Sequence, residues 1–183
     1  PPFLGAVQVA PLQGAALTTG FRVSTAGWLD EAPQQLEYAF YSFRLPEGQT
    51  LQYAGGQLSC SSQCDLPQVD WHNKSSSSYW GKLGGSLLRS WSSAAVVSSD
   101  IALPAGSYYI VARARDQLGG AGAAASLGPL VTPLPGGVTQ QAARDALAQV
   151  AHDPEALLGA VDALALSGYS AGEQAAVVKL LLG

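Results

Sequence analysis

The sequence predicts a mainly β protein, a β-sandwich of about seven strands followed by a small α-helical segment. The clearest strand covers residues 107–115, where small and apolar side chains on one face alternate with residues that include Arg113 and Arg115 on the other. A turn signal, Leu103-Pro104-Ala105-Gly106, stands directly before it. Tyr108 lies near the start of this long strand, where many β-sandwiches place a corner tyrosine. These observations favour a sandwich over other β architectures.

Further strands are predicted along residues 1–132, separated by turns that contain Gly or Pro. From Gly55 to about Arg89 the chain shows no sustained periodicity. A connection of this length is usually functional, partly disordered or occupied by a short strand. The complete set of predicted strands is Ala6–Ala10, Leu17–Thr25, Leu36–Phe43, Thr50–Tyr53, Ala94–Ala102, Ser107–Arg115 and Ala123–Val131.

The alternation of the second and third predicted strands assigns their core-facing residues. Side chains at every second position of a strand point to the same face of the sheet. We expect the following residues to lie inward, alongside the indole of Trp28: Phe21, Val23, Leu36, Tyr38 and Phe40.

The sequence pattern changes after residue 132. We therefore divide the chain into a sandwich at 1–132, a Pro/Gly linker at 133–137 and about three short helices at 138–183. Helices this short bury little apolar surface by themselves, so we expect them to begin a larger helical region and to pack on a partner. Their apolar faces supply four candidate contact residues, Leu157, Val161, Val177 and Leu181.

The composition argues against several classes of function. The formal net charge of -4 over 183 residues gives no basic surface for nucleic acid. No apolar run reaches the roughly 20 residues that span a bilayer. Pro1-Pro2-Phe3-Leu4 has neither an initial Met nor the pattern of a signal peptide. We expect a piece of a longer protein whose targeting signal has already been removed.

Two features of the long connection indicate the secretory pathway. Cys60 and Cys64 are the only cysteines, and a local disulfide is favoured over two free thiols or a metal site, which takes about four ligands. Asn73 stands in Asn73-Lys74-Ser75, an N-glycosylation sequon, although such sequons also arise by chance. Together they predict a secreted or cell-surface protein.

An ordered set of motifs runs through the predicted sandwich: Phe-x-x-Ser-x-x-Gly-Trp-x-Asp-Glu from Phe21 to Glu31, then Pro33, Leu36-x-Tyr38-x-Phe40, Leu-Pro-x-Gly at 103–106 and Asp-x-Leu-Gly at 116–119. This set resembles the REJ (receptor for egg jelly) module of polycystin-1-type proteins and of sperm receptors for egg jelly. Gly106-Ser107-Tyr108 and the alternation after it are similar to the last strands of PKD-type sandwiches. The resemblance covers about residues 10–131. It implies an immunoglobulin-, fibronectin-III- or PKD-like sandwich.

The chain departs from that family at two points. The family usually has Pro-Leu where this chain has Pro33-Gln34-Gln35-Leu36, which leaves the strand alternation intact. Helical material in such proteins commonly precedes a self-cleaving domain, and residues 138–183 resemble its beginning. His72 and His152 both lack the residues of the self-cleavage signature after them. Any cleavage is therefore expected outside this chain.

Residues for a catalytic or metal site are few: Asp65, Asp70, His72 and Asp153. Catalysis needs a positioned pair of nucleophile and base, and a metal needs ligands on a rigid frame. A polar loop contains the same residue types without any site. We expect no catalysis, no cofactor and no bound metal.

Exposed aromatic and basic residues are the better candidates for contact with other molecules. Trp71 and Trp80 lie in the long connection, where they either contact a partner or cap the edge of the sandwich. Arg113 and Arg115 are expected on the outward face of their strand, where they either meet acids of a neighbour or face solvent.

We accordingly expect a non-catalytic extracellular module of a polycystin-1-like membrane protein, on the outer face of the plasma or ciliary membrane. Its role would be adhesion, scaffolding or association with a channel. The resemblance implies as partners other extracellular domains of the same chain, a polycystin-2-type channel subunit or an extracellular filament protein, and the tryptophans make a glycan a further candidate. The alternative, based on the tryptophans, is a carbohydrate-binding module of a secreted or surface protein.

Overall fold

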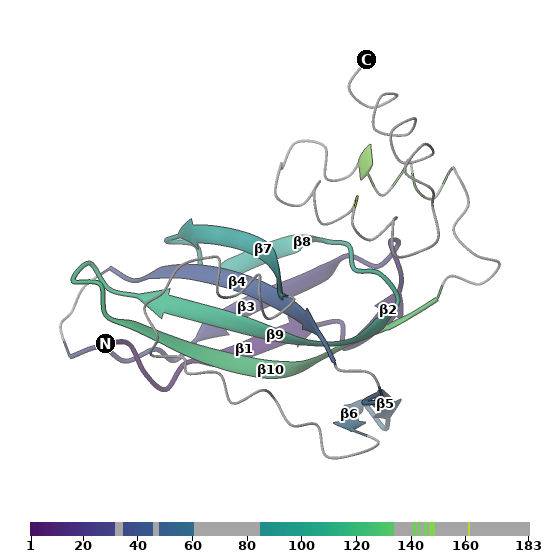
Figure 1. The fold of residues 1–183 in the computed structure, drawn as a ribbon, viewed down its shortest axis with the longest axis horizontal. Coiled ribbons are helices and arrows are strands. Elements are labelled where there is room, and N and C mark those ends of the chain that lie inside the picture. The colour runs from purple at the N-terminus through teal and green to yellow at the C-terminus, as the bar shows by residue number, and fades with distance from the viewer. Residues whose placement is uncertain are drawn as a thin grey trace.

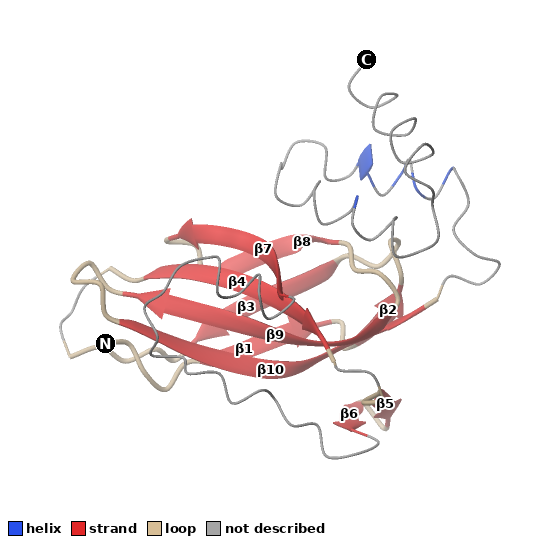
Figure 2. Ribbon diagram, viewed as in Figure 1, coloured by secondary structure: helices blue, strands red, loops and turns tan. Residues whose placement is uncertain are grey.

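The computed structural model describes residues 1–31, 35–45, 48–60 and 85–133, and the single positions 141, 143, 145, 147, 148 and 161. This part of the chain is a mainly β protein with the layered strands of a β-sandwich (Figures 1 and 2). The strands are β1 (Ala6–Ala10), β2 (Gln13–Ala15), β3 (Phe21–Ala26), β4 (Glu37–Arg44), β5 (Leu51–Ala54), β6 (Gln57–Cys60), β7 (Gly85–Ser92), β8 (Val96–Ile101), β9 (Gly106–Arg115) and β10 (Ala121–Thr132).

Two sheets form the sandwich. One has three strands in the order β1-β3-β8, and the other has five in the order β2-β10-β9-β4-β7. The β2–β10 pair is parallel, and the other pairs within these two sheets are antiparallel. Because β1 joins the smaller sheet and β2 joins the larger one, the N-terminal part of the chain contributes to both layers.

The main core lies between the two sheets and confirms the predicted alternation. In β3 the buried positions are Phe21, Val23 and Thr25, with exposed or half-buried residues between them. Trp28 and Tyr38 are partly buried and pack against this core, whereas Leu36 precedes β4 and is half-buried. The buried residues of the core are Val7, Val9, Ala16, Phe21, Val23, Phe40, Val97, Ile101, Leu103, Tyr108, Ile110, Ala112 and Val131.

The second face of the larger sheet is also buried. It holds Ala39, Tyr41, Phe43, Leu45, Leu51, Tyr109 and Val111. The rings of Phe43 and Tyr109 are stacked, with centroids 4.9 Å apart and planes 7° from parallel. Leu58 of the β5–β6 hairpin packs against this cluster and lies close to Gly128. A Cβ added at Gly128 would lie 2.7 Å from the Cδ1 atom of Leu58. The missing side chain at Gly128 makes room for the hairpin.

The strand predictions were wrong in three places. The connection from Gly55 to about Arg89, for which a short strand was one of the alternatives, contains β6 and most of β7, and neither is among the predicted strands. In β7 the pairing with β4 shifts register twice, which breaks the period-2 pattern that the prediction used. β2, only three residues long, was not predicted. The predicted strand Leu17–Thr25 begins only at Phe21, because Leu17 has a left-handed backbone (φ 62°) and Thr19 N–H donates to Ala15 O in a turn.

Helical structure is described at only a few positions after residue 133. Gln141, Ala143, Asp145, Leu147 and Ala148 are helical, and Ala143 and Leu147 are completely buried. Most of the three helices predicted at 138–183, and the linker beyond Pro133, lie outside the described residues. In the part of the chain that is described, no helix is long and apolar enough to cross a membrane.

Candidate functional site

The two arginines predicted to face outward both contact a tryptophan, Trp91. Arg113 is only 6% exposed, so its expected place on an open surface was wrong. The guanidinium carbons of Arg113 and Arg115 lie 5.3 and 4.4 Å from the ring centre of Trp91 in β7. Ala39 of β4 lies between these strands, opposite Arg113 in register. Its small side chain leaves room for the indole to reach across β4.

Arg115 has an acidic partner within the chain. Its Nε donates to Glu37 Oε2 at 2.7 Å, and its Nη2 lies 2.6 Å from the same oxygen. Both side chains are more than two-fifths exposed, so this ion pair contributes at most about 1 kcal/mol. Arg113 is therefore part of the packing of the sheet, whereas Arg115 keeps part of its side chain open to solvent.

The other predicted site residues fall largely outside the description. Cys60 is disulfide-bonded, while its predicted partner Cys64 is not described. Val161 is helical and half-buried. Residues whose surroundings the structure does not describe are Cys64, Trp71, Asn73, Trp80, Leu157, Val177 and Leu181.

One end of the sandwich exposes apolar side chains. The β9–β10 turn and the N-terminus lie at this end (Figure 1). Phe3, Leu4, Leu29 and Leu118, which we call the loop-end surface, are between 46% and 80% exposed. Two backbone hydrogen bonds join Phe3 and Leu29, from Phe3 N to Leu29 O at 2.9 Å and from Leu29 N to Phe3 O at 3.0 Å.

The loop-end surface rests on a fixed backbone. Trp28 Nε1 donates to Thr25 Oγ1 at 2.7 Å, and its ring occupies the space that a side chain at Gly5 would need. In the β9–β10 turn, Asp116 Oδ1 accepts the N–H groups of Leu118 and Gly120 at 2.8 and 2.7 Å. These bonds hold the turn that carries Leu118.

A polar cleft of about 390 Å³ adjoins this end. It is lined by Gln35, Glu37, Ser93, Asp116 and Gln117. Glu37 is bonded to Arg115 and Asp116 to the turn, so both carboxylates already have structural roles. Within the described ranges, no group of three or more His, Cys, Asp or Glu residues can hold a metal ion.

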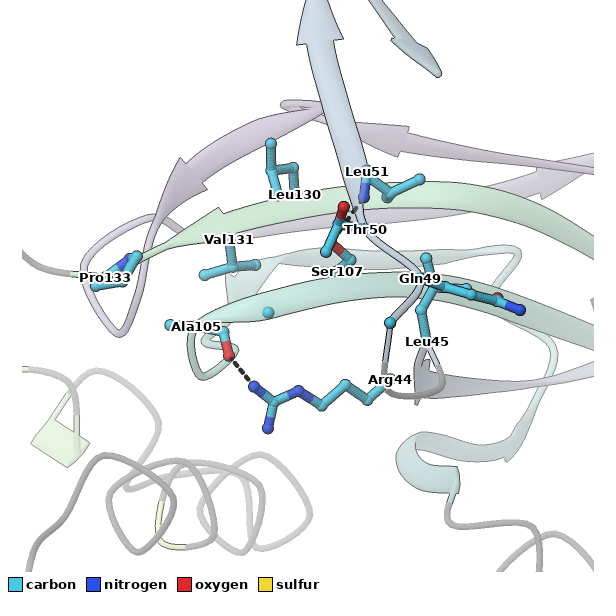
Figure 3. Close-up of a pocket in the computed structure, with 12 residues that line it drawn as sticks. Arg44, Leu45, Gln49, Thr50, Leu51, Ala105, Ser107, Leu130, Val131 and Pro133 are labelled. Atoms are coloured by element: carbon cyan, nitrogen blue, oxygen red, sulfur yellow. Dashed lines mark hydrogen bonds between the residues drawn. The ribbon is translucent and has the colours of Figure 1, made fainter. Parts of the chain in front are cut away.

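A larger cleft, of about 800 Å³, lies at the opposite end of the sandwich, where β4 and β10 end and β9 begins (Figure 3). We call it the Arg44 cleft, and sequence analysis did not predict it. Its lining residues are Arg44, Leu45, Gly48, Gln49, Thr50, Leu51, Ala105, Gly106, Ser107, Leu130, Val131 and Pro133.

Hydrogen bonds fix the polar groups of this cleft. Arg44 Nη2 donates to Ala105 O at 2.9 Å, and Ser107 Oγ accepts the N–H of Leu51 at 3.0 Å (Figure 3). Leu45 N–H donates to Ser107 O at 2.8 Å. The Arg44 side chain lies against Gly106, where a Cβ would be 2.8 Å from its Nε. These bonds join the end of β4 and Leu51 to the start of β9, and β10 adjoins the same place through its pairing with β9.

Tyr108 supports the strand that borders this cleft. Its hydroxyl donates to Pro104 O at 2.9 Å, four residues upstream, which is the hydrogen bond of a tyrosine corner. Burial raises the pKa of Tyr108 to about 12, against an opposing effect of the Arg44 charge. The corner predicted from sequence is confirmed.

The raised pKa predicts a loss of stability in alkali. Unfolded tyrosine ionises near pH 10, whereas folded Tyr108 does so near 12. Below pH 10 the raised pKa contributes its full stabilisation of the folded state, about 2–3 kcal/mol. This contribution is lost as the pH rises from 10 to about 12, and it changes no further at higher pH. Burial shifts Tyr109 in the same direction. In Tyr108→Phe the unfolding free energy, measured by urea titration at each pH, should fall less steeply between pH 10 and about 12. An unchanged dependence of that free energy on pH would contradict the assignment.

Comparison of the chain with family models, with curated proteins and with solved structures finds no match. The two ends of the sandwich are therefore the candidate functional sites.

Proposed function

We propose that this chain is a non-catalytic contact module of a polycystin-1-like, REJ-containing surface protein, acting in adhesion, scaffolding or channel association outside the cell. The observation that carries the proposal is the loop-end surface, Phe3, Leu4, Leu29 and Leu118. Binding residues are often placed on loops held by a rigid scaffold, and apolar side chains gathered on such loops favour protein–protein contact.

The disulfide at Cys60 supports the extracellular part of the proposal. Disulfides form and persist in oxidising compartments and are rare in the cytosol. The partners proposed are a neighbouring extracellular domain of the parent protein, a polycystin-2-type channel subunit or an extracellular filament protein. Contact would occur at the membrane surface, through the loop end of the sandwich.

Site-specific photocrosslinking tests this function. A photoreactive amino acid at Leu118, which is 80% exposed, should form adducts with another extracellular protein or domain when the full chain is displayed on cells. With the photoreactive amino acid kept at position 118, the double variant Phe3→Ser/Leu29→Ser should reduce the adduct yield about tenfold. Its melting temperature should change little, because both substituted side chains are about half exposed.

The matched control carries the same crosslinker at Gln8, an exposed position on the outer face of β1. Gln8 should give few adducts. Equal yields from both positions, no adduct from position 118, or full yield from the double variant would each overturn the proposal.

A further inference from the structure

We propose that the Arg44 cleft is a binding site for a carboxylate of an apolar peptide segment. It lies at the opposite end of the sandwich from the loop-end surface and does not depend on the function proposed above. The peptide carboxylate would pair with the guanidinium of Arg44, and neighbouring apolar side chains would lie along the cleft walls.

The guanidinium of Arg44 is held ready for an anion. One N–H of Nη2 donates to Ala105 O, and Gly106 allows the side chain to lie close to the backbone. Among the described residues Arg44 makes no salt bridge, and the Ala105 carbonyl is a neutral acceptor. Because a guanidinium has several N–H donors in a planar fork, most of them stay available to a ligand.

The cleft has apolar surface beside its polar groups. Leu130 and Ala105 are half-buried and Pro133 is exposed where β10 has ended, whereas Leu45, Leu51 and Val131 also line the cleft but are at most 7% exposed. A volume of about 800 Å³ falls in the range of clefts that bind small molecules or short segments. Such sites combine apolar walls with a few placed polar groups, here Arg44 together with the hydrogen-bonded Ser107.

Two considerations select a peptide carboxylate over other anions. The flat fork of arginine matches the two oxygens of a carboxylate, and apolar walls match a ligand with aliphatic side chains. No aromatic residue is among those that line the cleft in the described part of the chain, so it lacks the stacking platform of sugar sites. The chain carries a net charge of -4, so its overall field does not attract anions. Binding of a carboxylate therefore depends on a local positive group, here Arg44.

Titration of the full chain with matched peptides tests this site. The first pair of probes is acetyl-Leu-Val-Leu with a free terminal carboxylate and the same peptide with a C-terminal amide. The second pair is acetyl-Leu-Glu-Leu amide, which carries a side-chain carboxylate, and its neutral counterpart acetyl-Leu-Gln-Leu amide. Backbone NMR signals of Leu51, Gly106 and Ser107 should shift with at least one carboxylate peptide. Its neutral counterpart should bind at least about tenfold more weakly, because a hydrogen-bonded charge is lost.

Substitutions at Arg44 separate charge from geometry. Arg44→Ala should weaken binding of the carboxylate peptide at least about tenfold, and Arg44→Lys should weaken it by less, since lysine keeps the charge but loses the fork. Arg22→Ala, which removes an exposed arginine of β3, is the matched control and should leave the affinity unchanged. Melting curves of each variant establish that the sandwich remains folded.

Several results would overturn the proposal. They are equal affinity for acid and neutral peptides, unchanged affinity in Arg44→Ala, and no binding of any peptide at about 1 mM. Sodium glucuronate or sodium sulfate binding as tightly as the peptide would instead indicate a saccharide or simple anion site. Loop-end substitutions should leave this affinity unchanged, so failure here and failure of the proposed function can be told apart.

Discussion

Replacing Phe40 by alanine is expected to lower the free energy of unfolding by about 3–5 kcal/mol. Phe40 is completely buried in the middle of β4 and belongs to the core between the sheets. β4 is paired with β7 on one side and β9 on the other, so the cavity left by the ring lies in a well-supported part of the fold. Partial collapse of the surroundings would recover little of the lost packing.

Urea unfolding followed by tryptophan fluorescence measures this effect. Phe3→Ala is the matched control, because the same side chain is 46% exposed there and its loss should cost less than about 1 kcal/mol. Many domains are stable by only about 5–15 kcal/mol, so the Phe40 variant should be near its limit at room temperature. If the two substitutions cost the same, the register of β4 in the core is wrong.

Local patterns were enough to predict the central strands. β9 has a clean alternation, turn residues before it and a tyrosine corner, and each of these depends on residues close together in sequence. β1 was predicted with its observed bounds, Ala6–Ala10. Phe21, Val23 and Phe40 were assigned to the core from period-2 spacing alone. In β1 and β3, where one face is buried and the other exposed, the alternation of the sequence matches the alternation of burial.

Burial on two faces explains what the sequence did not reveal. Alternation in β9 placed Arg113 on the face away from the core, and this was correct, but that face is covered as well. The cover near Arg113 includes Trp91 from β7, a strand whose irregular pairing removes its sequence signal. The alternation of a strand therefore predicts which face of the sheet an arginine occupies. How exposed the arginine is depends on the side chains of the neighbouring strand.

The sequence did not predict the Arg44 cleft for a related reason, because the segments that line it are far apart in the chain. Its walls come from the end of β4 and the residues after it, the start of β9 and the end of β10. The Leu-Pro-x-Gly motif at 103–106 indicates only a turn before β9, and Arg44 looks like an ordinary polar residue at a strand end. Only the pairing of β4 with β9, and of β9 with β10, brings them together. Sites of this kind follow from long-range topology.

Replacing Trp91 by alanine is expected to cost about 2–4 kcal/mol of unfolding free energy. The partly buried indole packs against the buried residues on the second face of the larger sheet, and it contacts both Arg113 and Arg115. Its loss removes apolar contacts and two cation–π interactions together. Trp91→Phe, which keeps a smaller ring at the same position, should recover part of the loss in the same urea titration.

Double-mutant cycles would divide the effect between the two arginines. Arg115 lies closer to the ring but is 42% exposed, whereas Arg113 is buried. Cation–π contacts are worth about 0.5–1 kcal/mol when exposed and about 2 when removed from water. The coupling of Trp91 with Arg113 should therefore exceed its coupling with Arg115, despite the longer distance. A larger coupling with Arg115 would mean that distance, and not removal from water, sets the strength of this cluster.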